Sequence, residues 1–380
     1  MFFTATTGFC EKFIIHEIEN FMVHPEGSYC LDWNKNNTLA IGGRSGTIVI
    51  ISETKATQYT KKKQFSSSSP WGFCGVKKID AHNNSVIKIK WSPHENKFAS
   101  VSLDRIIKIW HLDKQDECIT NIEHINKLID LDWNPQPKFK HIIATASVHK
   151  IKIWDLNASK APKLIRHFDD EICSICWHPG GKKIIIGLYN NNPNARPPEV
   201  PIVNGKLVRG HLQLFNVYND ETDNFIDATI QESHQETIRE NKTNYVMRPS
   251  FLFFKNENTI LCGECNGYLK FHDLNDFSAG KAFKMEYGVA FVHNVTYNSK
   301  ANLTAAFCQE FCLFNGKPNY ENFVRFWENN ESIGKFFLEI NPQCDISGMS
   351  FCPNGNYLAC VFRDGNIHIL EIKKIADKID

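Results

Sequence analysis

Two neighbouring stretches of this chain repeat each other, and this repeat limits the folds that the chain can adopt. The first copy spans Ala81–Leu112 and the second spans Glu123–Leu156. Each copy begins near a His, has a Trp nine residues later and ends in an apolar segment closed by a second Trp. A unit of about 40 to 45 residues with three short strands cannot bury its apolar faces alone, so it must stack on other copies.

Fainter copies recur along the rest of the chain. They start near residues 24, 167, 245, 291 and 346, which brings the number of copies to seven. A chain of 380 residues often forms two or three domains, but an array of repeats grows by adding units. We predict an all-β fold in which residues 1–380 form one seven-bladed β-propeller.

The N-terminal segment offers the strand that the last copy lacks. The seventh copy has three strand-like runs, and two further runs, Phe2–Thr6 and Lys12–Ile18, precede the first copy. Unpaired sheet edges invite pairing with other chains, and a ring closed by its N-terminal strand avoids them. We expect that closure here. Because one strand is enough, the second run leaves an eighth, partial blade as an alternative.

The repeats resemble those of the WD40 family, in which four polar groups of a blade form one buried hydrogen-bond chain. Carried over to the second copy, the resemblance assigns the imidazole to His82 and the carboxylate to Asp104. It assigns the indole to Trp110 and the hydroxyl to Ser100, with Ser102 as the second choice. Each group would cost free energy if buried alone, whereas together they hold three strands in register.

The third copy keeps part of this chain of groups. The resemblance assigns His124, Thr145 and Trp154 to it, but Val148 and His149 stand where a turn carboxylate is needed. We therefore expect the second blade to be the most rigid one.

Composition argues against several classes of function. The formal net charge of +1 provides no basic surface for nucleic acid, and no apolar run reaches the roughly 18 residues of a membrane-spanning helix. The opening residues lack the basic and apolar regions of a secretory leader. The 13 cysteines are odd in number and fall mostly in strand patterns, which favours free thiols. We expect an intracellular protein, cytoplasmic or nuclear, that binds neither nucleic acid nor membrane.

Catalytic and metal-binding patterns are missing from the readable segments. Residues three apart in a strand point to opposite faces, so Cys173 and Cys176 cannot share one metal ion unless the strand contains a bulge. Cys262 and Cys265 flank a turn and are the one pair worth testing for zinc. There is no glycine-rich phosphate loop, nucleophile elbow or His-Glu-x-x-His helix. The sequence predicts no enzyme activity, no cofactor and no metal.

Four segments that are longer than a turn interrupt the repeats. They cover about residues 52–72, 189–208, 232–244 and 315–333 and are rich in polar residues, Ser or Pro. Inserted loops on a rigid scaffold often carry binding specificity. Plain loop growth without a binding role explains them equally well.

Two hypotheses on function compete. The first is a non-catalytic scaffold that binds protein partners as a subunit of a hetero-complex. The second is a reader of a modified peptide tail, methylated or phosphorylated, at the mouth of the central channel. It follows from a similarity to the Polycomb family of embryonic ectoderm development propellers, a chromatin family that reads methyl-lysine. The similar segments are Phe2–Gly8, Leu39–Gly46, Ser100–Asp104 and Gln343–Ile346.

A methyl-lysine cage needs several aromatic rings around the ammonium. In the Polycomb family, aromatic residues four positions before the closing aromatic residue of the first strand build this cage. The matching positions in this chain are Tyr29, Ile87, Ile129, Cys173, His293 and Ser347. Only Tyr29 is a cage-type aromatic residue, so methyl-lysine reading would need further rings such as Phe2 or Trp71.

The same ring of positions is still the best candidate for a face that contacts a protein or peptide partner. We predict that Tyr29 and His293 contribute to this face together with the turn residues Arg44 and Arg363. An arginine at such a mouth can bind a carboxylate or phosphate of a peptide through two parallel hydrogen bonds. A solvated turn residue is the plainer interpretation of both arginines.

Overall fold

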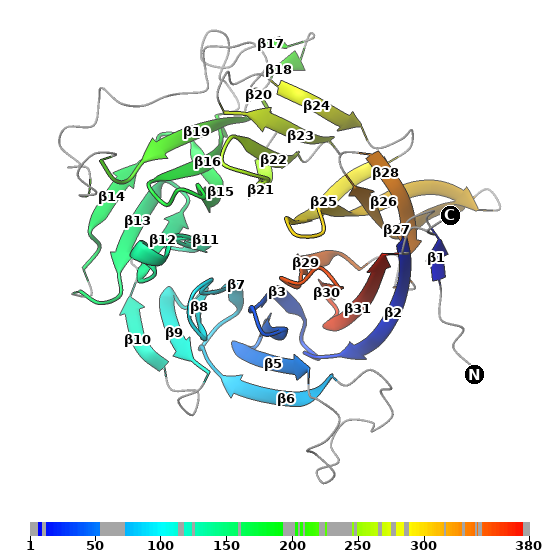
Figure 1. The fold of residues 1–380 in the computed structure, drawn as a ribbon, viewed down its shortest axis with the longest axis horizontal. Coiled ribbons are helices and arrows are strands. Elements are labelled where there is room, and N and C mark those ends of the chain that lie inside the picture. Colours follow the sequence, from blue (N-terminus) through cyan, green and yellow to red (C-terminus); the bar gives the residue numbers. More distant parts are fainter. Residues whose placement is uncertain are drawn as a thin grey trace, which may run out of the picture.

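The computed structural model describes most of the chain. Its described residues are 7–9, 13–53, 73–112, 118–123, 126–158, 161–192, 202–203, 206–207, 210–219, 225, 245–246, 249–264, 268–274, 279–284, 289–314, 317–328, 331–338, 340 and 344–374. Within them, seven antiparallel sheets stand around a central axis, each with its first strand innermost (Figure 1). The prediction of an all-β, seven-bladed propeller is confirmed.

Blade one corresponds to the copy that starts near residue 24, and blades two and three correspond to the two clear copies. Blade one contains β3 (Ser28–Trp33), β4 (Thr38–Gly43), β5 (Thr47–Glu53) and β6 (Phe73–Asp80). Blade two contains β7 (Val86–Trp91), β8 (Lys97–Ser102), β9 (Ile106–His111) and β10 (Cys118–Glu123). Blade three contains β11 (Leu128–Trp133), β12 (Ile142–Ser147), β13 (Lys150–Asp155) and β14 (Leu164–His167), with a 3-10 turn at Pro137–Phe139.

The next three blades are built in the same way. Blade four contains β15 (Glu171–Trp177), β16 (Lys183–Tyr189), β19 (Gly210–Asn216) and β20 (Tyr245–Val246). Blade five contains β21 (Pro249–Phe254), β22 (Thr259–Glu264), β23 (Tyr268–Asp273) and β24 (Ala279–Lys284). Blade six contains β25 (Val289–Asn298), β26 (Leu303–Phe314), β27 (Lys317–Glu328) and β28 (Glu331–Phe337).

Blade seven joins the two ends of the chain. Its inner strands are β29 (Ile346–Phe351), β30 (Tyr357–Phe362) and β31 (Asn366–Lys374), and β2 (Phe13–Met22) pairs antiparallel with β31. The short β1 (Thr7–Phe9) adds a fifth strand outside β2. Both N-terminal strands therefore belong to this sheet, and the described residues form no eighth blade. The expected run at residues 2–6 lies outside the described residues.

Apolar side chains fill the space between every pair of neighbouring blades. In the described residues there are seven such clusters, and each draws on two adjacent sheets. In β4, Leu39 and Ile41 pack toward blade seven, whereas Ala40 packs toward blade two. Because both faces of each sheet are buried, the strands read as continuous apolar runs. The core is thus a closed belt between the blades.

Each first strand contains a β-bulge in the same place. In blade one the register shifts between Ser28 and Cys30, and in blade two between Val86 and Lys88. The other five first strands have a bulge near their beginning as well. A bulge inserts an extra residue and re-aims the side chains beside it. Consecutive residues, such as Tyr29 and Cys30, can therefore both line the channel.

The segments that the sequence predicted as inserted loops are not all loops in the structure. The expected loop at 315–333 is wrong, because β27 and the start of β28 occupy Lys317–Glu328 and Glu331–Phe337. Residues 322–328 of β27 are all buried, so polar residues in this strand do not mark a loop, and the Asn-Gly dipeptide at 315–316 is typical of a hairpin turn. In the segment 189–208, Tyr189 ends β16, and β17 (Ile202–Val203) pairs with β18 (Lys206–Leu207). Residues 54–72 and all of 232–244 lie outside the described residues.

Candidate functional site

A buried hydrogen-bond chain crosses blade two. His82 Nδ1 lies 3.0 Å from Asp104 Oδ2, and His82 Nε2 lies 2.7 Å from Ser100 Oγ. The Trp110 indole N–H donates to the same Ser100 Oγ at 2.9 Å. Burial lowers the pKa of His82, and the Asp104 carboxylate opposes that shift. Ser102, the second choice from sequence, instead donates to the main-chain oxygen of Asn84 at 2.9 Å.

Blade three has a shorter version of this chain. The Trp154 indole N–H donates to Thr145 Oγ1 at 2.9 Å. His124 lies outside the described residues. These side chains hold the strands of their blades together, which is a structural role.

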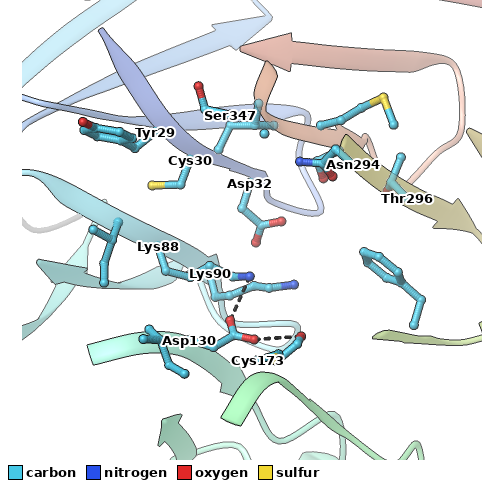
Figure 2. A pocket seen from close by; sticks show the side chains of 18 residues that line it. Tyr29, Cys30, Asp32, Lys88, Lys90, Asp130, Cys173, Asn294, Thr296 and Ser347 are labelled. Atoms are coloured by element: carbon cyan, nitrogen blue, oxygen red, sulfur yellow. Dashed lines mark hydrogen bonds and ion pairs between the residues drawn. The ribbon is translucent and has the colours of Figure 1, made fainter. Parts of the chain in front are cut away.

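A cavity of about 240 Å³ lies at the centre of the ring (Figure 2). All seven innermost strands contribute to its wall. The residues that line it are Tyr29, Cys30, Leu31, Asp32, Ile87, Lys88, Lys90, Ile129, Asp130, Cys173, Ser174, Phe253, Asn294, Thr296, Ser347, Gly348, Met349 and Ser350.

Charged side chains line the cavity on the side of blades one to three. Lys88 Nζ forms an ion pair with Asp130 Oδ1 at 2.8 Å. The other oxygen, Asp130 Oδ2, accepts hydrogen bonds from Ser174 Oγ at 3.0 Å and from the Ile175 amide at 2.9 Å. Burial raises the pKa of Asp130, but Lys88 and the hydrogen bonds from the Ile175 and Leu131 amides together hold the pKa below its ordinary value. Asp130 is therefore a carboxylate that is fully engaged by blades two and four.

A second group of charges lies one residue before the closing Trp of three first strands. Asp32 and Asp132 each accept a hydrogen bond at 2.8 Å, from the amides of Trp91 and Trp177. Burial alone would lower the pKa of Lys90, but Asp32 and Asp132 raise it above its ordinary value. Burial raises the pKa of both carboxylates. Asp32 and Asp132 thus both stabilise the charged form of Lys90.

The wall on the side of blade six is polar but uncharged. Asn294 is 6% exposed and Thr296 is 4% exposed, and both line the cavity from β25. Aromatic side chains are few, since only Tyr29 and Phe253 are aromatic among the described residues of the lining. The cavity wall therefore suits a polar ligand group better than a group that must be enclosed by aromatic rings.

Two exposed arginines flank a glycine where blades seven and one meet. The Arg44 amide donates to the Gly27 oxygen at 2.9 Å, while a Cβ atom on Gly27 would lie 2.4 Å from the Arg363 oxygen. Arg44 is exposed, and the Arg363 side chain is 64% exposed with Nη1 3.5 Å from Asp345 Oδ2. The main chain of both turns is fixed by hydrogen bonds, and the guanidinium groups remain in solvent. We call the face that carries these turns the mouth face.

Two segments of the chain match a known family model. Residues 74–111 and 335–370 match the model described as WD domain, G-beta repeat. Each match covers the outer strand of one blade and the three inner strands of the next. The chain is a WD40-repeat β-propeller.

Curated relatives of this WD40 propeller are similar over a limited part of it. WD repeat-containing protein AAC3 of Dictyostelium discoideum is 30% identical over 31% of this chain and 24% of its own length. Coatomer subunit beta'-2 of Arabidopsis thaliana is 27% identical over 28% of this chain and 12% of its own length. THO complex subunit 3 of Arabidopsis thaliana is 25% identical over 29% of this chain and 36% of its own length. The chain thus covers well under two thirds of each relative. Neither the family model nor these relatives support the similarity to Polycomb propellers.

The predicted partner-binding residues of the WD40 propeller are only partly brought together. Tyr29 lines the cavity, with Ile87, Ile129, Cys173 and Ser347 at the matching positions of other blades. Arg44 and Arg363 lie in turns of the mouth face. His293 belongs to β25, but its side chain lies outside what the structure describes.

Sequence reasoning missed the charges deeper in the channel of this WD40 propeller. Asp32, Lys90 and Asp132 each stand immediately before a Trp at the repeat interval, and that recurrence was the available signal. Among the described residues, no group of three or more His, Cys, Asp or Glu side chains could hold a metal ion. Cys262 is described and buried, whereas Cys265 is not described. No helix in the described residues is long and apolar enough to cross a membrane.

Proposed function

We propose that this WD40 propeller is a non-catalytic scaffold that binds protein partners as a subunit of a hetero-complex. Two relatives, a coatomer subunit and a THO complex subunit, are named as members of complexes, which supports this proposal. The net charge of +1 supports partners other than nucleic acid or membrane. We propose that the protein acts inside the cell, in the cytoplasm or nucleus.

The observation that carries the proposal is the arrangement of the mouth face. Arg44 and Arg363 are exposed on turns whose main chains are fixed around Gly27, at the end of the ring where the first strand of blade one begins. A rigid support lowers the entropy lost when a partner binds. Guanidinium groups bind carboxylates and phosphates through paired hydrogen bonds. We therefore propose an acidic or phosphorylated segment of a partner protein as the ligand of this face.

A methylated tail is the second candidate ligand, and the cavity wall supports it less. A quaternary ammonium needs aromatic faces around it. In the described lining, Tyr29 lies four residues before its closing Trp, whereas Phe253 lies one residue before its closing Phe. Their strand positions place these two rings at different depths of the channel, so they do not form one cage.

The test is capture of partners by charge-reversed variants. Tagged wild-type protein, the double variant R44E/R363E and the control K35E/K300E are used as baits. Lys35 and Lys300 are exposed in turns between first and second strands, on the face opposite to the mouth. We expect R44E/R363E to lose a set of partners that the control keeps, with the melting temperature unchanged. Identical partner sets for all three baits would contradict the proposal.

A variant without residues 54–69 separates the mouth face from the first inserted segment. If the segment carries the binding, this deletion loses the partners and R44E/R363E keeps them. If the mouth face carries it, the deletion keeps them.

A further inference from the structure

One buried histidine connects the two turns of the mouth face. His24 is 3% exposed. Its main-chain N–H donates to the oxygen of Gly365, in the turn of Arg363, at 3.3 Å. Its main-chain oxygen accepts the Gly27 N–H at 2.9 Å, and the Gly27 oxygen in turn accepts the Arg44 amide. His24 is therefore bonded directly to one turn and through one residue to the other.

The imidazole ring of His24 packs against the second turn as well. Nε2 lies 3.2 Å from the Ile41 oxygen, and Nδ1 lies 3.1 Å from Thr47 Oγ1. A Cβ atom on Gly43, the residue before Arg44, would lie 2.5 Å from Nδ1. The ring thus fills the space in which a side chain at position 43 would stand. A displacement of the ring therefore changes the packing of the residue that enters the Arg44 turn.

The hydrogen bonds determine which nitrogen of the neutral ring carries the hydrogen. A carbonyl oxygen can only accept, so Nε2 donates to Ile41 and Nδ1 accepts from the Thr47 hydroxyl. Thr47 Oγ1 also lies 3.0 Å from Oγ of Ser45, which belongs to the Arg44 turn. A proton on Nδ1 makes this nitrogen a donor, so the Thr47 hydroxyl must reverse and direct its hydrogen to Ser45. Protonation of the ring thus changes a hydrogen bond inside the turn.

The surroundings of His24 disfavour a charged ring. Burial lowers the pKa of His24 below 6.5, the hydrogen bond with Ile41 opposes this shift, and Lys78 of β6 adds to it. The strands β4 and β5 meet the ring with the Ile41 oxygen and the Thr47 hydroxyl. The charged residues of the neighbouring turns are Glu26, Arg44, Arg363 and Asp364. A proton on His24 is therefore unfavourable while the ring is held between the two turns.

We infer that His24 is a pH-sensitive switch of the mouth face: protonation of its ring loosens the turns of Arg44 and Arg363 together. The consequence for binding rests on the proposed function, because a face whose turns are loose loses the rigid support that favours partner binding. Partners are then released from this face in acid.

The sign of the pH dependence follows from the two forms of the switch. In the closed form the ring is held between the turns, and the pKa of His24 is below 6.5. In the open form water reaches the ring, and its pKa returns to about 6.5. The closed form is therefore fully favoured above pH 6.5 and loses this advantage as the pH falls toward the pKa of the closed form.

Hydrogen exchange at pH 7.5 and 5.5 tests the switch without any partner. Mass spectrometry follows segments 42–47 and 362–366 in wild type and in His24→Gln, and protection factors remove the intrinsic pH dependence of exchange. We expect wild-type protection of both segments to fall about twofold or more at pH 5.5, because each unit between the two pKa values allows about a tenfold change. His24→Gln cannot be protonated and should show no such fall. Segment 34–38, in the same blade on the opposite face, is the internal control and should stay protected.

Lys78 provides a second variant that leaves the buried ring in place. Lys78→Gln removes the charge that opposes protonation of His24, so protection should be lost at a higher pH than in wild type. The matched control is Lys77→Gln, because Lys77 is also exposed and successive residues of a strand point to opposite faces. We expect Lys77→Gln to follow wild type. The same midpoint for Lys78→Gln and wild type would count against the switch.

Three results would overturn the inference: protection of both turns that does not change with pH, an equal fall in His24→Gln, or an equal fall in segment 34–38, which would mean that the whole blade unfolds. Partner capture at the two pH values then connects the switch to the proposed function. We expect wild type, but not His24→Gln, to lose at pH 5.5 the partners that R44E/R363E loses. If the turns respond to pH while R44E/R363E keeps every partner, the proposed face fails and the switch stands.

Discussion

Asp32 and Trp91 are joined twice across the boundary between blades one and two. The Trp91 amide donates to Asp32 Oδ2 at 2.8 Å, and the Trp91 indole N–H donates to the Asp32 main-chain oxygen at 3.0 Å. The next boundary repeats the second bond, because the Trp133 indole donates to the Lys90 oxygen at 2.8 Å. These bonds thus fasten the first strands of blades one, two and three to one another.

Removing the Asp32 carboxylate should loosen this boundary. Asp32→Ala leaves the buried Trp91 amide without its acceptor, and we expect the free energy of unfolding to fall by about 1.5–3 kcal/mol. Asp32→Asn keeps an acceptor and should lose less. Urea denaturation of the three proteins measures the difference. Equal stability of the Ala and Asn variants would show that the bond contributes nothing.

The hydrogen-bond chains of blades two and three predict which of two substitutions destabilises the protein more. Ser100→Ala removes the partner of both His82 and Trp110, whereas Thr145→Ala removes one described partner, that of Trp154. Each buried group that loses its hydrogen-bond partner costs about 1–3 kcal/mol, so Ser100→Ala should be the more destabilising change. Thermal unfolding followed by tryptophan fluorescence tests the order. A larger loss for Thr145→Ala would contradict it.

Gly27 should be essential for the mouth face. Its φ of +108° is unfavourable for any residue with a side chain, and a Cβ atom would collide with the Arg363 oxygen at 2.4 Å. We expect Gly27→Ala to lower stability by at least about 1–2 kcal/mol and to displace the Arg363 turn. The matched control is Gly180→Ala, because Gly180 has no positive φ and its nearest contact would be a His178 side-chain atom at 3.1 Å. Hydrogen exchange of the segment 362–366 measures the displacement, and unchanged exchange would count against it.

Acidification should destabilise blade one through His24. Burial lowers the pKa of His24 from 6.5, and Lys78 lowers it further, while a hydrogen bond with the Ile41 oxygen opposes both. The unfolded chain therefore binds more protons as the pH falls below about 6.5. The stability from neutral His24 is fully present above that pH and is lost as the pH falls toward its folded pKa.

Denaturant midpoints at pH 7.5 and 5.5 test this dependence on His24. We expect the decrease to be smaller in His24→Gln, which cannot be protonated, than in wild type. His167→Gln serves as the control because His167 is exposed. Equal pH dependence of His24→Gln and wild type would exclude His24 as the source. Asp32 and Asp132 act in the opposite sense at lower pH, since their raised pKa values favour proton uptake by the folded state.

The fold could be predicted from sequence because the repeat spacing encodes one blade. His82 and Trp91 recur as His124 and Trp133, and that interval determines the strand order. The expected loop at 315–333 was wrong because blade sheets are buried on both faces. Their strands then lack the alternation of polar and apolar residues by which a half-buried strand is found.

Counting positions along the repeats predicted a residue that lines the channel, but it did not predict the charged residues deeper in the channel. Counting four residues back from each closing aromatic residue led to Tyr29, which does line the cavity. The cluster of Asp32, Lys90 and Asp132 depends on how three strands meet around the axis, and no single strand reveals it.

Site-specific cross-linking tests the central claim, that partners dock on the mouth face, most directly. A photoreactive phenylalanine analogue is placed at Tyr29, in the channel mouth, and separately at Lys300, exposed on the opposite face. Each protein is irradiated in its native complex. We predict that position 29 yields a covalent adduct with a partner protein and that position 300 yields none. An adduct from position 300 alone would contradict the account.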